Sequence, residues 1–141
     1  MMTTGRWRAL DRLHRRVENR VERVLHRELG VSAREFHALT ALQDGAREAE
    51  GQLHFDELAD GIGLSQSATS RLVTRLRDRG LITTSTSVYD RRSVEVRLTP
   101  LAHDVLRVGA PLLERAVHDA VEALGAGDTD GDLIRYLQGP A

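Results

Sequence analysis

The 141-residue sequence predicts a mainly α-helical fold of the α+β class, with several helices and one small β-hairpin. Apolar residues recur at spacings of three and four through most of the chain, which is the pattern of one side of an α-helix. The spacing changes to two only between residues 81 and 98, which indicates two β-strands. The length fits a single domain, residues 1–141, and leaves no room for two.

Composition excludes several classes of protein. The sequence is 40% hydrophobic and 29% charged, which is typical of a globular chain rather than a disordered one. It contains no cysteine, so disulfides, thiolate metal sites and cysteine nucleophiles are excluded. No apolar run approaches the roughly 18 residues of a membrane span, and the first residues lack the apolar core of a secretion signal. We therefore expect a cytoplasmic protein without membrane association.

The formal net charge of −1 conceals two basic blocks. Residues 1–29 and 65–97 each carry a charge of +4, whereas residues 30–64 carry −5 and residues 98–141 carry −4. All 20 basic residues are arginine, a bias that codon usage alone could produce. Whatever its origin, the planar guanidinium group suits phosphate oxygens and the edges of guanine.

The first basic block is predicted to form a helix over residues 6–29, with an apolar stripe of Leu10, Leu13, Val17, Val21 and Val24. Such a narrow stripe packs against one neighbouring helix or against a second subunit. Gly30 ends this helix. Ser32 then caps a second helix, with Glu35 three positions later, and this helix ends near Gly45.

The next elements are short and closely spaced. Residues 53–55 form an extended piece, and a short helix follows over residues 56–61. Gly63 then provides a tight turn. Ser65 caps a longer helix that runs to residue 79, and Gly80 closes it.

A hairpin and a long helical region complete the chain. The hairpin covers residues 81–98, and the charged segment 88–93 joins its two strands. Thr99 then caps a helix that has Pro100 at its first position. Residues 100–138 are predicted to contain this helix and a short final one.

The order of helix, turn, helix and basic hairpin over residues 32–99 is that of a winged helix-turn-helix. Gly63 permits the tight turn, Ala59 lets the two helices approach closely, and Leu64 fills the turn. The second helix, residues 65–79, is apolar on one side and carries hydroxyls and arginines on the other. Such a face fits the major groove of DNA, which is about 12 Å wide.

This part of the chain resembles the DNA-binding lobe of MarR-type transcriptional regulators. The motifs that carry the resemblance are LHFDELADGIGLSQSATSRLVTRLRDRGLI at residues 53–82 and DRRSVEVRLT at residues 90–99. The second is the more specific, because the family has an acidic residue two positions before the wing arginine and then a Leu-Thr helix start. The resemblance implies a winged helix-turn-helix lobe, residues 32–99, between dimerisation helices at residues 6–29 and 100–138.

The resemblance further implies a homodimer that binds a pseudo-palindromic operator in double-stranded DNA. The recognition helix, residues 65–79, would enter the major groove, and the tip of the wing (residues 81–98) would reach the neighbouring minor groove. Asp90 would stabilise the wing as the partner of Arg92. The DNA contacts predicted from the polar helix face and from the resemblance are Ser65, Gln66, Ser67, Thr69, Ser70, Arg71, Thr74, Arg75, Arg91 and Arg92.

The chain departs from the family pattern, and the first departure leaves an alternative function open. The family often has a basic residue in the strand after Gly80, where this chain has Thr83 and Thr84, and it usually has glycine where this chain has Ala102. The alternative function is therefore a winged-helix module for protein–protein contact without DNA binding. The arginines of the recognition helix could also be solvated surface residues, and those of the wing could protect a strand edge.

In the family the second helix lines an effector pocket, which here implies Phe36, His37 and Thr40 as its walls. The expected effector is a small aromatic or phenolic molecule that releases a repressor from DNA. Because cysteine is absent, the trigger should be a ligand rather than thiol oxidation. Trp7 is expected to pack against the dimer partner or to form part of this pocket, and packing against the partner is the favoured role.

An enzymatic or metal-binding function is not indicated. The six histidines include no pair at i, i+4 spacing, which would suit a metal site on a helix. Asp56 and Asp60 lie one turn apart, but acidic residues near a helix N-terminus more often complement the helix dipole. We therefore expect no catalytic residue, no metal and no cofactor.

Overall fold

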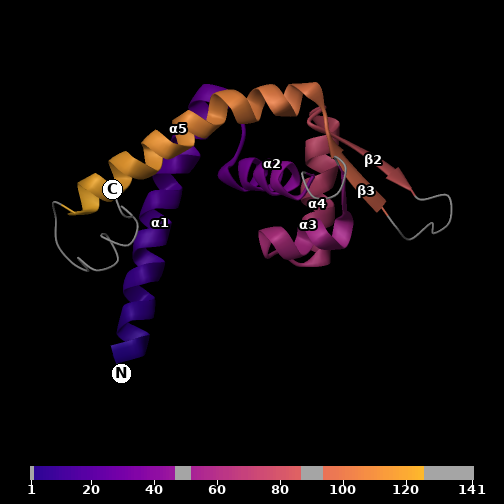
Figure 1. Ribbon diagram of the computed structural model, residues 1–141. Helices are drawn as coiled ribbons and strands as arrows, with labels where there is room; N and C mark the ends of the chain where they lie inside the picture. The colour runs from indigo at the N-terminus through magenta and orange to yellow at the C-terminus, as the bar shows by residue number, and fades with distance from the viewer. Residues whose placement is uncertain (1, 47–51, 87–93, 126–141) are drawn as a thin grey trace. The chain divides into compact units, whose positions relative to one another are not determined.

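The computed structural model describes residues 2–46, 52–86 and 94–125 and consists of two compact units (Figure 1). The first unit is formed by Met1–Ala33 and Gly109–Ala141, and the second by Arg34–Val108. The predicted tip of the hairpin and the predicted short final helix lie outside the described residues.

The first unit contains α1 (Met2–Leu29) and the C-terminal part of α5 (Pro100–Gly125). Helix α1 begins a few residues earlier than predicted, because the polar residues at its start include no proline to stop it. Val21 and Leu25 are buried, whereas Leu10 is 47% exposed. Of the predicted apolar stripe of α1, only Val21 is therefore buried within one protomer, and Val24 is half-buried.

Most of α2 (Ala33–Ala46), together with α3 (Phe55–Ile62) and α4 (Gln66–Asp78), encloses the core of the second unit. These bounds agree with the predicted helices to within a few residues. Helix α4 contributes one whole side to the core, which leaves its other side facing outward. The fully buried side chains of this unit include Phe36, Leu39, Leu42, Leu58, Leu72, Leu76, Ile82 and Val96.

A three-stranded antiparallel sheet with the order β1-β3-β2 completes the second unit. The strands β2 (Ile82–Thr86) and β3 (Val94–Leu98) form the predicted hairpin. The extended piece predicted at residues 53–55 corresponds to β1 (Gln52–His54), and its pairing with the other edge of β3 was not predicted. A strand of this length carries too short a pattern to reveal a partner that lies far away in the sequence.

Helix α5 begins at Pro100, as the sequence predicts. The hydroxyl of Thr99 accepts a hydrogen bond from the N–H of Ala102 at 3.2 Å, which is the expected N-cap. The helix continues through Pro111 to Gly125. Within the described part of the chain, no helix is both long enough and apolar enough to cross a membrane.

Candidate nucleic-acid interface

A tight turn connects α3 to α4. Gly63 ends α3 with φ of +69°, a left-handed conformation that glycine adopts without steric cost. The N–H of Leu64 donates to the carbonyl of Ala59 at 3.2 Å, which completes the end of the helix. Ser65 then begins α4, and its hydroxyl accepts from the N–H of Ala68 at 3.2 Å. The predicted helix-turn-helix is therefore present.

Helix α4 has one buried side and one exposed side. Leu72, Val73 and Leu76 are buried in the core. The opposite side exposes short polar side chains and arginines, which is the composition expected of a face that meets DNA. The exposed residues from the predicted DNA-contacting set are Ser65, Gln66, Ser67, Ser70, Arg71, Thr74 and Arg75.

Thr69 does not belong to this exposed side, and its assignment as a DNA contact is corrected. Its side chain is 0% exposed, and its hydroxyl donates to the carbonyl of Ser65 at 2.8 Å. The methyl group of threonine packs in the core, while the hydroxyl is satisfied one turn earlier in the same helix. Thr69 therefore stabilises α4 from the inside.

The exposed polar groups of α4 differ in how far the protein already engages them. The hydroxyl of Thr74 donates to the carbonyl of Ser70 at 3.0 Å, so it can offer DNA only its acceptor capacity without breaking that bond. Among the described residues, neither Arg71 nor Arg75 has a carboxylate partner. Their guanidinium groups can therefore bind an external phosphate or base edge without first losing an ion pair.

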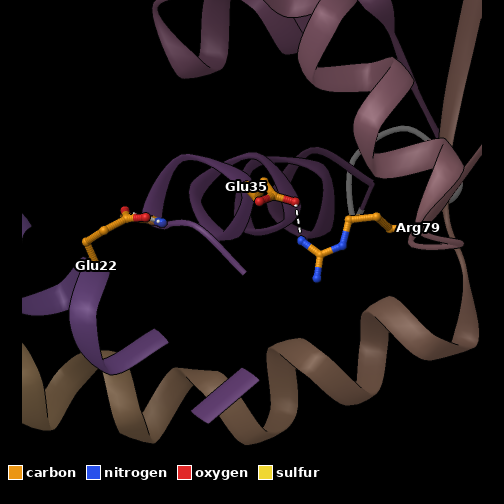
Figure 2. A network of polar contacts seen from close by, with 4 residues as sticks. Glu22, Glu35 and Arg79 are labelled. Atoms are coloured by element: carbon orange, nitrogen blue, oxygen red, sulfur yellow. Dashed lines mark hydrogen bonds and ion pairs between the residues drawn. The ribbon is translucent and has the colours of Figure 1, made fainter. Parts of the chain in front are cut away.

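A partly buried ion pair holds the C-terminal end of α4 (Figure 2). Arg79 is the C-cap residue of α4, and its Nη1 donates to Oε2 of Glu35 in α2 at 2.7 Å. The side chain of Glu35 is 10% exposed and that of Arg79 is 40% exposed. A carboxylate this deeply buried needs a partner. The pair therefore ties the C-terminal end of α4 to the first turn of α2.

The local sequence pattern places Glu35 only in the cap of its own helix, and no pattern points to Arg79. The two residues are 44 positions apart, so no local pattern links them. A second carboxylate acts at the start of α2, where Oε2 of Glu22 accepts from the N–H of Ala33 at 2.7 Å (Figure 2). The first N–H groups of a helix lack partners within the helix, and Glu22 satisfies one of them.

Two hydrogen bonds of Thr99 connect the end of β3 to the residues that follow α4. Its hydroxyl donates to the carbonyl of Gly80 at 2.7 Å, and its N–H donates to the carbonyl of Leu81 at 3.1 Å. Gly80 has φ of +75°, which lets the chain turn directly from the recognition helix into β2. Thr99 was recognised in the sequence only as a helix cap, but it also fixes the wing to α4.

The wing carries an exposed arginine that sequence analysis did not select. Arg97 in β3 is exposed and pairs in register with Thr83 of β2. Because Val96 beside it is fully buried, Arg97 and Thr83 share the opposite face of the sheet, away from the core. The cation of Arg97 therefore lies next to the segment where the expected basic residue is missing. The alternation of residues along β3 was the signal that could have identified it.

The remaining wing residues of the predicted set cannot be placed. Asp90, Arg91 and Arg92 lie outside the described residues. Their roles in stabilising the wing and in contacting DNA stay predictions.

The three residues predicted to line an effector pocket differ in accessibility. Phe36 is 1% exposed and belongs to the core of the second unit, whereas His37 is exposed. The hydroxyl of Thr40 donates to the carbonyl of Phe36 at 3.0 Å. A ligand could reach Phe36 only if the core opened. No group of three or more potential metal-binding side chains occurs among the residues that the structure describes.

Comparison with known proteins agrees with this architecture. A family model described as the MarR family matches residues 29–93. The structure of Sco3205, a MarR family transcriptional regulator from Streptomyces coelicolor in complex with DNA, is 28% identical, with a TM-score of 0.74. That match covers 85% of this chain and 74% of Sco3205.

Two further structures share the fold. AbsC, a MarR family transcriptional regulator from Streptomyces coelicolor, is 24% identical with a TM-score of 0.73, over 92% of this chain and 83% of AbsC. BpsR from Bordetella bronchiseptica, whose DNA binding is regulated by 6-hydroxynicotinic acid, is 21% identical with a TM-score of 0.67, over 92% of this chain and 94% of BpsR.

The matched family is one of regulators and not of enzymes. The family model spans α2, α3 and α4, and the structural likeness extends over most of the chain. On this basis the chain is similar to the MarR family of transcriptional regulators, by sequence over residues 29–93 and by fold over most of its length.

Proposed function

We propose that this protein binds double-stranded DNA in the cytoplasm as a homodimer and represses transcription from a pseudo-palindromic operator. Each α4 enters the major groove, and each wing reaches the adjacent minor groove. The two recognition helices must then lie about one DNA turn apart, roughly 34 Å, to engage both half-sites. A small-molecule effector that prefers the unbound state of the dimer releases it from the operator.

The single observation that carries this proposal is the exposed side of α4. It presents hydroxyls and two arginines without carboxylate partners among the described residues. The turn at Gly63 fixes the start of α4. The ion pair of Glu35 and the hydrogen bond of Thr99 fix its end. A fixed helix with such a face is suited to read base edges and to bind phosphates. The Sco3205 structure, which contains DNA, supports the same use of the fold.

The proposal that a small molecule regulates this protein is supported by a different relative. BpsR responds to 6-hydroxynicotinic acid, an aromatic acid. We propose a small aromatic or phenolic effector for this protein as well. His37 is the exposed member of the predicted pocket residues, and Thr40 is half-buried, so these two are the more accessible candidates for contact.

The test is a fluorescence anisotropy titration of the full-length protein against DNA from upstream of its own gene. Saturable binding at physiological salt to a palindromic sequence, with one dimer per site, is the expected result. Arg71→Ala should relax the base preference at one position by about 1–3 kcal/mol. A protein that binds all sequences equally, or none, would contradict the proposal.

The wing provides a second arm of this test. Arg92→Ala should weaken binding to every sequence and lower the slope of log K against log salt concentration by about 1, because one phosphate contact is lost. Arg97→Gln should have the same effect if Arg97 supplies the missing cation. Arg107→Ala is the matched control, because this arginine is exposed in α5 and pairs with Asp104. An unchanged salt slope for Arg92→Ala would show that the wing does not contact DNA.

The alternative function, a winged-helix module for protein–protein contact, is not favoured. It was motivated by the absence of a basic residue at Thr83 and Thr84, but Arg97 places a cation on the same face as Thr83. The relatives compared above are transcriptional regulators, and one was solved with DNA.

A further inference from the structure

The first residue of α4 is held by a side chain of the preceding helix. Nε2 of Gln66 donates to Oδ1 of Asp56, in the first turn of α3, at 3.3 Å. Both helices belong to the second unit. Because both side chains are exposed, the contact adds little to the stability of the core. Its main effect is to fix the direction in which the side chain of Gln66 points.

The carboxylate of Asp56 also fixes which end of the Gln66 amide faces away from α3. A carboxylate only accepts hydrogen bonds, so the amide turns its NH2 group towards Asp56. The amide oxygen and the second N–H are then left for another partner. Asp56 is itself stabilised where it lies, because a negative charge in the first turn of α3 complements the helix dipole. Gln66 therefore offers one acceptor and one donor in a single defined orientation.

Gln66 lies at the end of α4 that reads bases when such a helix binds DNA. The N-terminal residues of a recognition helix are those that contact base edges in the major groove, and Gln66 is the first residue of α4. An amide oxygen beside an N–H complements adenine, whose N6 donates and whose N7 accepts. Guanine presents two acceptors, N7 and O6, so the fixed amide oxygen would meet a second acceptor there.

We propose that Asp56 is a positioning residue that sets the base preference of Gln66, and that the operator has an adenine where Gln66 meets it. The amide oxygen of Gln66 accepts from N6 of the adenine, and the second N–H donates to N7. Asp56 acts only through Gln66 and does not touch the DNA. This inference rests on the proposed function, because it names the specificity of the same α4 surface.

The contact between Asp56 and Gln66 has a consequence for DNA recognition that a purely structural contact would lack. Without Asp56, the Gln66 side chain must be ordered when it binds adenine, which lowers the affinity for that base about two- to twelvefold. The other bases gain no bidentate contact and lose nothing. At the same time, removal of a negative charge near the phosphates strengthens binding to every sequence. Loss of Asp56 should therefore reduce base discrimination without reducing the general affinity for DNA.

The experiment measures binding of the full-length protein to the palindrome from upstream of its own gene by fluorescence anisotropy. Each base pair of one half-site is replaced in turn, and the ratio of affinities is taken at every position. At one position the wild type should prefer adenine by about 5- to 150-fold. Gln66→Ala should abolish this preference. Asp56→Ala should lower it about two- to twelvefold at that position alone.

Three further variants separate position from charge. Asp60→Ala removes an exposed charge one turn later in α3 and leaves the contact of Gln66 intact, so it should alter affinity for all sequences equally. Asp56→Asn keeps a carbonyl acceptor beside Gln66 and should keep most of the preference. The double variant Asp56→Ala, Gln66→Ala should lose no more than Gln66→Ala alone, because the two residues act as one unit. Circular dichroism should give equal melting temperatures for all of them.

Four results would overturn the proposal. An unchanged preference in Asp56→Ala would show that Gln66 needs no positioning. A preference lost in Gln66→Ala for a base other than adenine would show that the amide points differently. A cytosine preference that disappears in Asp56→Ala but survives in Gln66→Ala would show that Asp56 itself reads the base. A preference in Asp56→Asn as low as in Asp56→Ala would show that the charge, and not the hydrogen bond, sets it.

The same measurements separate this proposal from the proposed function. No saturable binding to the palindrome would contradict the regulator itself, whereas operator binding with an unchanged preference in Asp56→Ala would overturn the positioning role alone. The contact can also be measured without DNA in the nitrogen-15 NMR spectrum of the free protein. The side-chain amide signals of Gln66, identified by their absence in Gln66→Ala, should move in Asp56→Ala and stay in place in Asp60→Ala. Signals that do not move in Asp56→Ala would overturn the positioning role as well.

Discussion

Glu35 illustrates how one buried charge can position the end of a helix, here α4. Its carboxylate is 2.7 Å from Arg79 and is largely removed from water. Each partner therefore depends on the other, but not equally. Loss of the arginine removes an ion-pair partner from a largely buried carboxylate, whereas neutralising the acid leaves a cation whose side chain is 40% exposed.

This asymmetry leads to a prediction for stability. Arg79→Gln should lower the free energy of unfolding by about 1–3 kcal/mol. Glu35→Gln should cost less, because the amide oxygen still accepts a hydrogen bond and no buried charge remains. Urea denaturation measures both values. Arg77→Gln is the control, since Arg77 is exposed on the same helix and a surface change of this kind usually stays within about 0.5 kcal/mol. Equal stability of Arg79→Gln and the wild type would contradict the anchoring role.

At the residue scale, the sequence predicts the direction of most side chains of α4 but not of Thr69. Leu72 and Leu76 are unambiguous because leucine is strongly favoured inside. Threonine is small and amphipathic, so it suits either side of a helix. Only the packing of neighbouring elements decided that Thr69 faces the core, and its hydroxyl found a partner in its own backbone.

At the scale of elements, the turn between α3 and α4 depends on the backbone of Gly63. A Cβ added there would meet no atom within 4 Å, so only the left-handed φ of +69° opposes a side chain. Gly63→Ala should therefore destabilise the protein by about 1–2 kcal/mol. Gly63→Asn should cost less, because asparagine tolerates this conformation better. Thermal melting gives the ranking, and an alanine variant as stable as the wild type would show that the turn relaxes.

Helices were predictable from the sequence because their signals are local. The spacing of apolar residues, the cap at Ser65 and the glycines at 63 and 80 all act within a few positions. The pairing of the third strand was not predictable. Leu53 pairs with Val96, and nothing in the three residues of β1 specifies that partner. The contact of Thr99 with Gly80 is of the same kind, because it depends on how the wing folds back.

At the scale of the whole molecule, the exposed apolar residues of α1 call for a partner. Trp7 is 63% exposed and Leu10 is 47% exposed within one protomer. Residues of this size cost free energy when left in water. The proposed dimer would cover them. Leu10→Glu should therefore shift the protein towards monomers, because it places a charge in a desolvated contact.

Sedimentation equilibrium over a range of protein concentrations measures this shift. Arg12→Glu provides the control, since Arg12 is an exposed polar residue of the same helix. DNA affinity should fall in parallel with the dimer population, because both half-sites must be engaged together. A Leu10→Glu variant that remains fully dimeric would place the subunit contact elsewhere.

The bond from Thr99 to Gly80 has a consequence for how such a regulator can diversify. It fastens both ends of the hairpin to the same point of the scaffold. The entropic penalty for closing a longer loop rises only slowly, by about 0.6 kcal/mol for each doubling of its length. Insertions and deletions between the strands should therefore leave folding nearly unaffected. The length of the wing can then change in evolution, and with it the number of flanking base pairs that the wing can contact, while the core that supports the wing stays the same.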